Sequence, residues 1–433
     1  MDAAAEHLQP LLSLLVNWER TRPDRRLWDL ATMRAHLARP GASAPPRPAI
    51  QVGGSKGKGT TCSFLEALAT STGRRAGVYS SPHVETILER IRCAGRTIPI
   101  EDLEPLLRRI VDTGVGERAP TFFEAMTLAA AEWFAARRTD LAIWEVGLGG
   151  RHDATSALPV DASIVTTIEL EHTDVLGDTV AAIAGEKAPV IRAGGVGFTG
   201  TEGEALAVVR AHCAANDARL FVFGEDFGYR DPRWSNDGFR AGLWLQDGRD
   251  VPVFLPDAAG FETASAALAI AAFAHLFPDA DLPVDPLVRE RPPCRFEIHA
   301  ESDGEVLVLD GAHTERSLAA VADELRRRWR GRRIGVLFAS AAGKRWREGL
   351  SALLPLADRF VVTELSGTSG EDPAAIAAFL AERGAPCEVA ADVESGLAAL
   401  RRGPGPRLVA GSFYLAGRVR KLVGSAARRT QQR

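Results

Sequence analysis

Residues 53–60 read GGSKGKGT and lie between the apolar run Ala49–Val52 and the helix-like segment Thr61–Ser71. Glycines allow backbone N–H groups to approach a polyphosphate, and the N-terminus of a helix favours its negative charge. The second lysine can reach the outer phosphates, and the threonine can bind Mg²⁺ through its hydroxyl. The pattern differs from the usual phosphate-loop expression, because a glycine separates this lysine from the threonine and the first glycine spacing is one residue short. Alone, it indicates either a nucleotide phosphate loop or a glycine-rich turn before a helix.

Short apolar runs alternate with helical patterns around this loop. Runs typical of strands occupy Ala49–Val52, Ala76–Ser80, Leu141–Val146 and Ser163–Ile168. Amphipathic segments occupy Thr61–Ser71 and Phe122–Arg137. The alternation predicts the α/β class, with a P-loop ATPase domain built on a mainly parallel sheet. Residues 220–256 are expected to form a β-rich appendage ahead of the helical segment 258–277.

A second α/β series follows later in the chain. Its strand-like runs are Val306–Leu309, Ile334–Phe338, Phe360–Thr363 and Leu408–Ala410, and its helical stretches are Ser317–Arg330, Pro373–Arg383 and Val393–Arg402. The intervening segment Asp279–Pro293 carries prolines that suit neither a continuous helix nor a central strand. We therefore expect an ATP-binding domain over residues 1–293 and a smaller α/β domain over residues 294–433.

Composition limits the possible partners and location. The 433 residues, 46% of them hydrophobic, suffice for two domains with filled cores. A formal net charge of -4 gives no electrostatic reason to expect a nucleic-acid partner. The five cysteines are scattered, without a C-x-x-C pair, which favours free thiols in a reducing compartment. No apolar stretch reaches 18 residues, so we expect a cytoplasmic protein with no membrane partner.

Eight further blocks accompany the phosphate loop. They are Tyr79–His83 with Glu89–Arg92, Thr121–Glu124, Glu145–Arg151 with Asp153–Thr155, Glu171–Thr173 with Leu176–Gly177, Glu186–Ala188, Arg295–Glu297, Asp310–His313 and Gly411–Tyr414. With these blocks in this order, and with the inserted glycine of the loop, the chain resembles the folylpolyglutamate synthase and dihydrofolate synthase family, a branch of the Mur ligase superfamily. The resemblance runs through most of the chain and implies an ATP-dependent amide ligase.

The prediction of a metal site rests partly on residue chemistry and partly on this resemblance. Glu145 ends a strand-like run, where open α/β sheets place ligand-binding residues, and its carboxylate suits Mg²⁺. His172 follows the next such run. A lone histidine is more often structural, whereas the resemblance makes it a ligand of a second Mg²⁺. The resemblance also implies that Ser81 supplies a hydroxyl and that Lys187 is carbamylated by CO₂, which turns a cation into a carboxylate-like ligand. The predicted catalytic residues are Lys58, Glu145, His172 and Lys187, and the predicted ligands of two Mg²⁺ ions are Thr60, Ser81, Glu145, His172 and Lys187.

The predicted ATP site takes residues from both domains. From the loop these are Gly54, Ser55, Lys56, Gly57, Lys58, Gly59 and Thr60. In the second domain Arg295, Asp310 and His313 resemble the family's ATP-contacting set, and arginine suits phosphate by its bidentate geometry. Sequence alone favours surface ion pairs and a strand-end turn for these three residues. The resemblance implies instead that ATP bridges the two domains.

The acyl substrate implied by the resemblance is dihydropteroate or a folate, and the amine is that of L-glutamate. The expected substrate contacts are Pro82, His83, Arg90, Phe123 and Glu124. A flat pterin needs an apolar wall and a few polar groups at its edge. Phe122 and Phe123 are adjacent on one helix and point in different directions, so at least one of them belongs to the core.

Four positions depart from the family's usual residues: Ser156, Glu171, Cys294 and Thr314. None of these departures removes a presumed ligand. They do weaken the inference that this chain uses the same acyl substrate as the family. The function expected is glutamate addition to a reduced folate, alone or together with dihydrofolate synthase activity, by a monomer. The alternatives are a Mur-type ligase acting on another carboxylate and a paralogue that binds nucleotide or folate without turnover.

Overall fold

The computed structural model describes residues 2–17, 29–116, 118–235, 237–365 and 370–431, with side chains up to residue 424. The chain divides into two compact units, Met1–Glu290 and Arg291–Arg433. Each unit has its own sheet and its own hydrophobic core.

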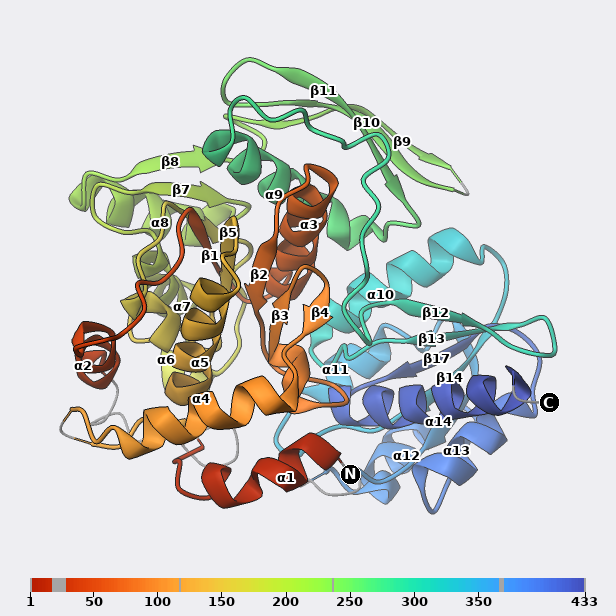
Figure 1. Cartoon of the computed structure of the whole chain (residues 1–433). Coiled ribbons are helices and arrows are strands. Elements are labelled where there is room, and N and C mark those ends of the chain that lie inside the picture. The colour runs from red at the N-terminus through yellow and green to blue at the C-terminus, as the bar shows by residue number, and fades with distance from the viewer. Residues whose placement is uncertain (1, 18–28, 117, 236, 366–369, 432–433) are drawn as a thin grey trace. The chain divides into compact units, whose positions relative to one another are not determined.

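The first unit is built on an eight-stranded sheet with the order β4-β3-β2-β5-β1-β6-β7-β8 (Figure 1). Its strands are β1 Ala49–Gly53, β2 Ala76–Tyr79, β3 Ile91–Cys93, β4 Arg96–Thr97, β5 Leu141–Glu145, β6 Ala162–Val165, β7 Val196–Thr199 and β8 Arg219–Val222. The neighbouring strands β2, β5, β1, β6, β7 and β8 pair in parallel, whereas β3 and β4 add antiparallel pairs at one edge. The mainly parallel sheet expected from the alternation is confirmed.

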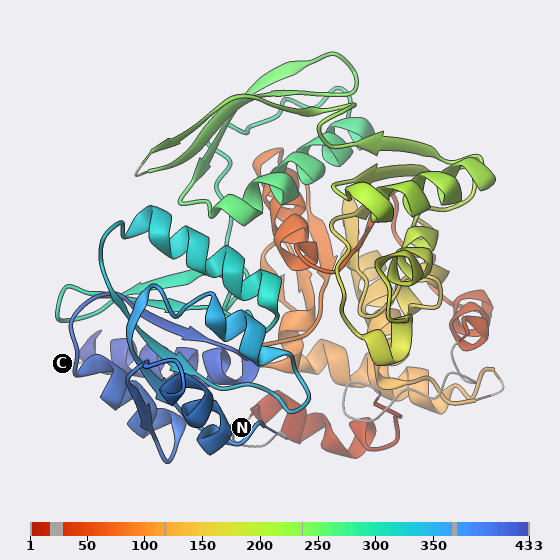
Figure 2. The same cartoon turned by 180° about the vertical axis from the view of Figure 1, so that it is seen from behind.

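Helices cover both faces of this sheet, as the two opposite views show (Figures 1 and 2). One face packs against α3 (Lys58–Ser71) and α9 (Thr263–Leu276), and the other against α5 (Phe122–Ala136), α7 (Val180–Lys187) and α8 (Gly203–Ala215). Successive residues of a strand point to opposite faces, so Ile50 and Val52 enter the first core while Ala49 enters the second. The remaining helices of this unit are α1 Ala3–Leu12, α2 Ala31–Ala38, α4 Ile100–Asp112 and α6 Thr173–Leu176, with the 3₁₀ turns η2 Ile87–Arg90, η3 Ala154–Ala157, η4 Ala188–Val190 and η5 Gly260–Glu262.

The β-rich appendage is smaller than the sequence suggested. It is an antiparallel sheet with the order β11-β10-β9, formed by β9 Gly228–Ser235, β10 Gly238–Trp244 and β11 Asp250–Pro256. The expectation that residues 220–222 belong to it was wrong, because β8 pairs in parallel with β7 in the main sheet. A short apolar run identifies a strand, but its periodicity does not say which sheet receives it.

The second unit contains a six-stranded sheet with the order β12-β13-β17-β14-β15-β16. Its strands are β12 Glu297–Ala300, β13 Val306–Leu309, β14 Ile334–Phe338, β15 Ala357–Val362, β16 Cys387–Val389 and β17 Arg407–Ala410, and its helices are α10 Glu315–Arg328, α11 Trp346–Ser351, α12 Pro373–Ala381, α13 Val393–Arg401 and α14 Phe413–Gln431. Only β12 runs antiparallel to its neighbour. The second α/β series is therefore confirmed, with an antiparallel edge strand that the sequence did not indicate.

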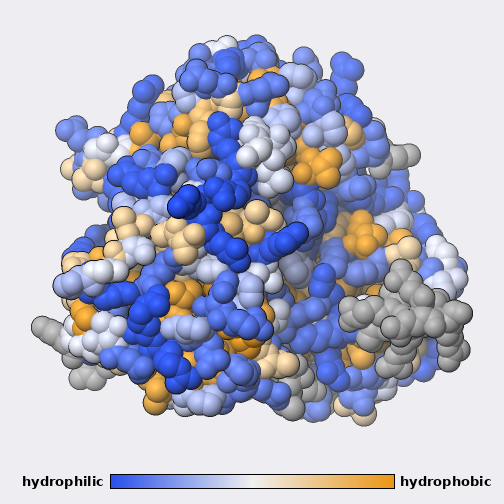
Figure 3. Space-filling view, viewed as in Figure 1, coloured by the Kyte–Doolittle hydropathy of each residue, from blue (hydrophilic) through white to orange (hydrophobic). Residues whose placement is uncertain are grey.

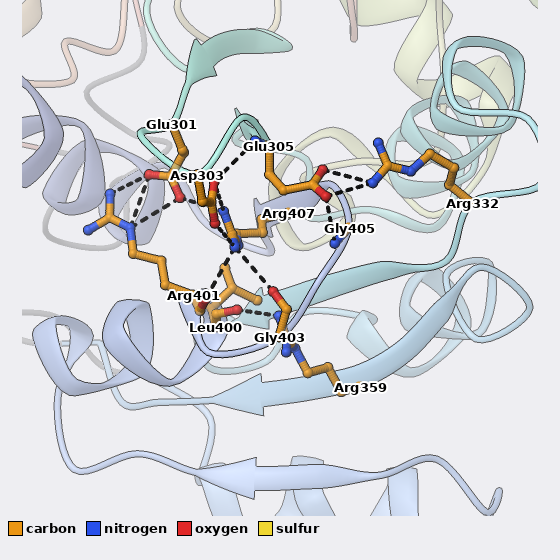
Figure 4. A network of polar contacts seen from close by, with 10 residues as sticks. All are labelled: Glu301, Asp303, Glu305, Arg332, Arg359, Leu400, Arg401, Gly403, Gly405 and Arg407. Atoms are coloured by element: carbon orange, nitrogen blue, oxygen red, sulfur yellow. Dashed lines mark hydrogen bonds and ion pairs between the residues drawn. The ribbon is translucent and has the colours of Figure 1, made fainter.

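A polar network closes the amino end of this second sheet (Figure 4). Arg407 begins β17 and is only 1% exposed. Its Nη1 donates to Glu301 Oε2 at 2.9 Å, and its two terminal nitrogens contact the Asp303 carboxylate. Arg401 binds the same Glu301 carboxylate, while Arg332 binds Glu305. The network thus holds the turn between β12 and β13 against the start of β17.

No described helix is long and apolar enough to cross a membrane. On the face drawn in Figure 3, hydrophobic residues form small patches among hydrophilic ones.

Candidate active site

The phosphate loop connects β1 to α3 in a conformation that requires glycine. Gly54 and Gly57 have φ angles of 131° and 89°, a region that residues with a side chain rarely adopt. A Cβ on Gly54 would lie 2.0 Å from Thr166 Oγ1, which donates to the carbonyl of Lys56 at 2.6 Å. The end of β6 therefore holds the loop close, and there is no room for a side chain at Gly54.

Lys58 lies at the start of α3 and turns back over the loop. Its Nζ donates to the carbonyl of Gly54 at 3.0 Å. The α3 N-terminus and this ammonium group together provide the positive charge that a polyphosphate needs. Thr60, in the first turn of α3, is buried. Ser55 and Lys56 are bound from the other side, because their backbone N–H groups donate to Thr167.

Glu145 ends β5, beside the phosphate loop. Its side chain is buried, and its Oε2 accepts from the backbone N–H of Ser81 at 3.1 Å. A Cβ on Gly59 would lie 3.6 Å from Oε1, so the carboxylate reaches the first turn of α3. The Glu145 carboxylate therefore lies beside the glycine inserted after Lys58.

A cluster of charged side chains surrounds Glu171. Lys187 Nζ lies 3.1 Å from Glu171 Oε1 and also donates to the Gly54 carbonyl at 3.0 Å. Lys56 Nζ lies 3.5 Å from Glu171 Oε2. Burial alone would raise the pKa of Glu171, but Lys58, Lys187 and Lys56 outweigh it and lower that pKa to about 2. The carboxylate is therefore ionised and gathers the lysines at the loop.

Lys187 ends α7 and is almost completely buried, with a side chain 3% exposed. Burial and the charge of Lys58 lower its pKa to about 8, against the opposing effect of Glu171. His172 follows Glu171, is exposed and adopts a left-handed conformation with φ 49° as the N-cap of α6. The structure thus brings Lys58, Lys187 and Glu171 together, with His172 adjacent in the chain.

The donors near the loop fit a hard cation by their chemistry. Among the residues that the structure describes, no group of three or more His, Cys, Asp or Glu side chains is placed to hold a metal. The predicted ligands instead combine the buried Glu145 carboxylate with hydroxyl groups of Ser81 and Thr60. Oxygen donors of this kind, completed by phosphate oxygens, are what Mg²⁺ uses in nucleotide sites.

The expected substrate residues lie in two places. His83 and Arg90 contact each other, and Phe123 lies against the loop after β5. Arg90 is buried, donates through Nε to His83 Nδ1 at 2.8 Å and lies 5.1 Å from the centre of the Phe122 ring. Phe122 is the core member of the aromatic pair, as expected for one of them. Phe123 instead packs on the loop after β5, because a Cβ on Gly147 would lie 2.7 Å from its Cζ.

Glu124 has a local structural role. It closes the start of α5, since its Oε2 accepts from Thr121 N at 2.7 Å, and it forms an ion pair with Arg118. Pro82 follows Ser81, whose backbone binds Glu145. Of Phe123 and Glu124, Phe123 is the residue that lies against the loop following Glu145.

In the second unit, two of the three predicted nucleotide contacts, Arg295 and His313, lie near one aromatic ring. Asp310 follows β13, and its two carboxylate oxygens accept from Phe296 N and Ala312 N, each at 2.7 Å. The Arg295 guanidinium lies 4.2 Å from the centre of the Phe413 ring, and the His313 ring lies 6.3 Å from it. The sequence did not single out Phe413 as a contact of these residues. A Cβ on Gly311 would lie 2.2 Å from this ring, which explains why a glycine follows Asp310.

A family model, described as the Mur ligase glutamate ligase domain, matches residues 294–411. A probable bifunctional folylpolyglutamate synthase/dihydropteroate synthase of Halobacterium salinarum is 32% identical over 94% of this chain and 51% of its own length. A similarly described protein of Haloferax volcanii is 36% identical over 64% of this chain and 34% of its own length. The chain thus spans about half of the first of these relatives and about a third of the second. The dihydrofolate synthase/folylpolyglutamate synthase of Bacillus subtilis is 27% identical over 90% of this chain and 94% of its own length.

Solved structures agree over nearly the whole chain. Mycobacterium tuberculosis folylpolyglutamate synthase complexed with ADP has a TM-score of 0.86, 25% identity and 98% coverage of both chains. The bifunctional enzyme of Yersinia pestis complexed with AMPPNP and Mn has a TM-score of 0.82 and 26% identity, covering 97% of this chain and 98% of that one. Escherichia coli FolC in complex with DHPP and ADP has a TM-score of 0.81 and 25% identity, with 98% coverage of both chains. The chain belongs to the folylpolyglutamate synthase and dihydrofolate synthase family of the Mur ligase superfamily.

Proposed function

We propose that this protein joins L-glutamate to the carboxylate of a folate-type molecule, with ATP as the source of the activating phosphoryl group. The observation that carries the proposal is the convergence of Lys58 and Lys187 on the Gly54 carbonyl, with the buried Glu145 at the end of the adjacent strand. Family membership and relatives complexed with ADP, AMPPNP, Mn and DHPP support it.

The phosphate loop and Lys58 would hold the polyphosphate of ATP. The γ-phosphoryl group passes to an oxygen of the substrate carboxylate, ADP leaves, and an acyl phosphate forms. The neutral amine of L-glutamate attacks the acyl carbon. The tetrahedral intermediate loses its proton and expels phosphate, which leaves an amide. Lys58 would neutralise the charge that crowds between phosphate and carboxylate in the first step.

Two Mg²⁺ ions would supply further charge neutralisation and orient the phosphate oxygens. Thr60, Ser81 and Glu145 are the proposed ligands on one side, and His172 with Lys187 on the other. Lys187 suits carbamylation because CO₂ adds only to a neutral amine, and burial lowers the pKa of this amine to about 8. The product would carry negative charge at the place where the ammonium now contacts Glu171.

Phe123 is the proposed wall of the pterin site, because its ring lies against the loop that follows Glu145. Pro82, His83 and Arg90 are the proposed neighbours, with Arg90 fixing the His83 ring. In the second unit Arg295, Asp310 and His313 are the proposed nucleotide contacts. Arg295→Ala should weaken ATP use, and an unchanged dependence on ATP would remove this arginine from the site.

The experiment supplies ATP, Mg²⁺ and L-glutamate with dihydropteroate or tetrahydrofolate and measures ADP release and product mass. The proposal predicts ADP release that requires both glutamate and one of the two pteridines. Product from another carboxylate, with neither pteridine used, would leave the ligase chemistry standing and overturn the folate assignment.

A further inference from the structure

A fully buried glutamine lies behind the phosphate loop. Gln51 is in β1, two residues before its end, and its side chain lies on the same side of the sheet as η3 and η4. Arg192 Nη2 donates to Gln51 Oε1 at 2.8 Å. Arginine has no acceptor, so this bond fixes which end of the amide is the oxygen. Gln51 Nε2 therefore faces away from Arg192, toward η3.

This orientation sets the direction of two further hydrogen bonds. Gln51 Nε2 donates to Thr155 Oγ1 at 2.8 Å and to Ser156 Oγ at 3.0 Å. Each hydroxyl then accepts from Gln51 and must direct its own hydrogen elsewhere. Thr155 donates to Asp153 Oδ1 at 2.5 Å, and Ser156 donates to the Gly150 carbonyl at 2.5 Å. The glutamine thus determines the direction in which both hydroxyl groups donate their hydrogen bonds.

The acceptors of these hydroxyls hold the loop that follows Glu145. Asp153 Oδ2 accepts from Gly147 N at 2.9 Å and from Leu148 N at 3.2 Å. At the other end of the loop, Arg151 N donates to the Glu186 carbonyl at 3.0 Å. A Cβ on Gly150 would lie 3.1 Å from the Lys187 carbonyl. The loop therefore connects the strand that carries Glu145 with the helix end that carries Lys187.

We propose that Gln51, oriented by Arg192, is a positioning residue that fixes residues 147–151 and, through them, the two proposed metal ligands Glu145 and Lys187. Ser156, which stands where the family often has asparagine, is the partner that completes this arrangement in the present chain. Gln51 acts through Thr155 and Ser156 and not on the substrates. Its effect on turnover rests on the proposed function, whereas its effect on the loop does not.

The polarity of the amide distinguishes this role from simple space filling. In Gln51→Glu the shape is retained and Arg192 remains paired, but the oxygen that replaces Nε2 accepts hydrogen bonds. Thr155 and Ser156 must then turn their hydrogens toward residue 51, and Asp153 and the Gly150 carbonyl lose them. In Gln51→Met the hydroxyls are released and can still donate to their present acceptors. The isosteric change should therefore disturb the loop more than the apolar one.

The test is hydrogen–deuterium exchange of the ligand-free full-length protein, with unfolding followed separately for each variant. Gln51→Glu should speed exchange of the amides of residues 147–151 by about tenfold or more, and Gln51→Met by only about threefold. Ser156→Ala, which keeps Gln51 but removes the Ser156 hydroxyl with its bonds to Gln51 and to Gly150, is a second variant and should speed exchange at residues 150–151. Thr199→Val is the matched control, because it removes a buried hydroxyl in the same sheet that donates to Val165. It should leave the loop unchanged.

A second readout is Mn²⁺ binding in the presence of a non-hydrolysable ATP analogue, followed by electron paramagnetic resonance. Loss of the supporting contacts should weaken binding by about 10–100-fold in Gln51→Glu and leave Thr199→Val as wild type. Equal loop exchange in Gln51→Glu, Gln51→Met and the control would overturn the inference, even in an active folate ligase. The expected exchange and Mn²⁺ results in a protein that uses no pteridine would support the positioning role and overturn the proposed function.

Discussion

The Nζ atom of Lys187 lies 3.1 Å from Oε1 of Glu171, inside a site where the lysine side chain is only 3% exposed. This ion pair keeps the Lys187 ammonium group beside the phosphate loop, where it also donates to the Gly54 carbonyl. Conversion of Lys187 to a carbamate would reverse its charge and place two anions together, so the modified form needs a cation to hold it. Because of this pair, carbamylation of Lys187 is expected to depend on metal binding.

Lys187→Ala should lose activity by at least about 100-fold, because it removes the proposed carbamate ligand. Acetate or formate should restore part of the rate by supplying a carboxylate in the space that is left. ADP release with glutamate and substrate measures both effects. The exposed Lys344 provides the control, and Lys344→Ala should be as active as wild type with no response to acetate. A fully active Lys187→Ala variant would remove the residue from the site.

Carbamylation should increase as the pH rises through about 8. Burial lowers the pKa of Lys187 to about 8 from its usual 10.5, so about a tenth of this amine is neutral at pH 7, against about one in three thousand for an ordinary lysine. Raising the pH deprotonates the ammonium and exposes the nucleophile to CO₂. Carbon-13 bicarbonate followed by nuclear magnetic resonance should show a carbamate signal with a midpoint near pH 8 that is absent in Lys187→Ala. A signal that rises only above pH 10 would contradict the lowered pKa.

Lys58→Ala and Glu145→Ala should each reduce kcat by about 100-fold or more without unfolding the protein, since the first removes a positive charge beside the phosphates and the second removes a proposed metal ligand. Circular dichroism checks the fold, and ADP release checks turnover. Near-normal rates in either folded variant would refute that residue's role. Thr199→Val, outside the site, should keep its rate.

Gly54→Ala should abolish nucleotide binding, because its Cβ would lie 2.0 Å from Thr166 Oγ1 at a φ of 131°. Gly73→Ala is the matched control. It shares a positive φ of 73° but has no atom within 4 Å of the added Cβ, so only the backbone conformation costs about 1 kcal/mol. Calorimetric titration with ADP compares the two. Equal ADP affinity would show that the loop tolerates the side chain.

Arg407→Met should destabilise the second unit by about 2–3 kcal/mol. Breaking a buried ion pair commonly costs about 3–5 kcal/mol, and the loss is smaller here because Glu301 keeps Arg401 and Asp303 is half exposed. Arg402→Ala, in an exposed pair with Glu388, should change stability by less than about 0.5 kcal/mol. Denaturant unfolding measures both free energies, and equal values would refute the role of the network in Figure 4.

The sequence predicted the elements whose signals are local. The runs Ala49–Val52 and Leu141–Val146 form β1 and β5 as predicted. The helix predicted over Thr61–Ser71 also forms, but it begins earlier, at Lys58. Polar residues at the ends of neighbouring parallel strands meet at one sheet edge, so part of the site followed from the order of strands alone.

Contacts between residues far apart in the chain could not be predicted from local sequence patterns. Glu171 counted only as a departure from the family, and its contact with Lys56 joins residues far apart in the chain. The placement of β8 in the main sheet and of β12 as an antiparallel edge depends on pairing, which local periodicity does not encode. The contacts of Gln51 and Phe413 likewise depend on which residues folding brings next to them.

The proposed ligase activity is tested most directly by the mass of the product formed from ATP, Mg²⁺, L-glutamate and either dihydropteroate or tetrahydrofolate. We expect one ADP to be released for each glutamate joined by an amide bond to a pteridine carboxylate. If a folded protein that hydrolyses ATP with another carboxylate formed no amide product with either pteridine, this result would contradict the proposed function.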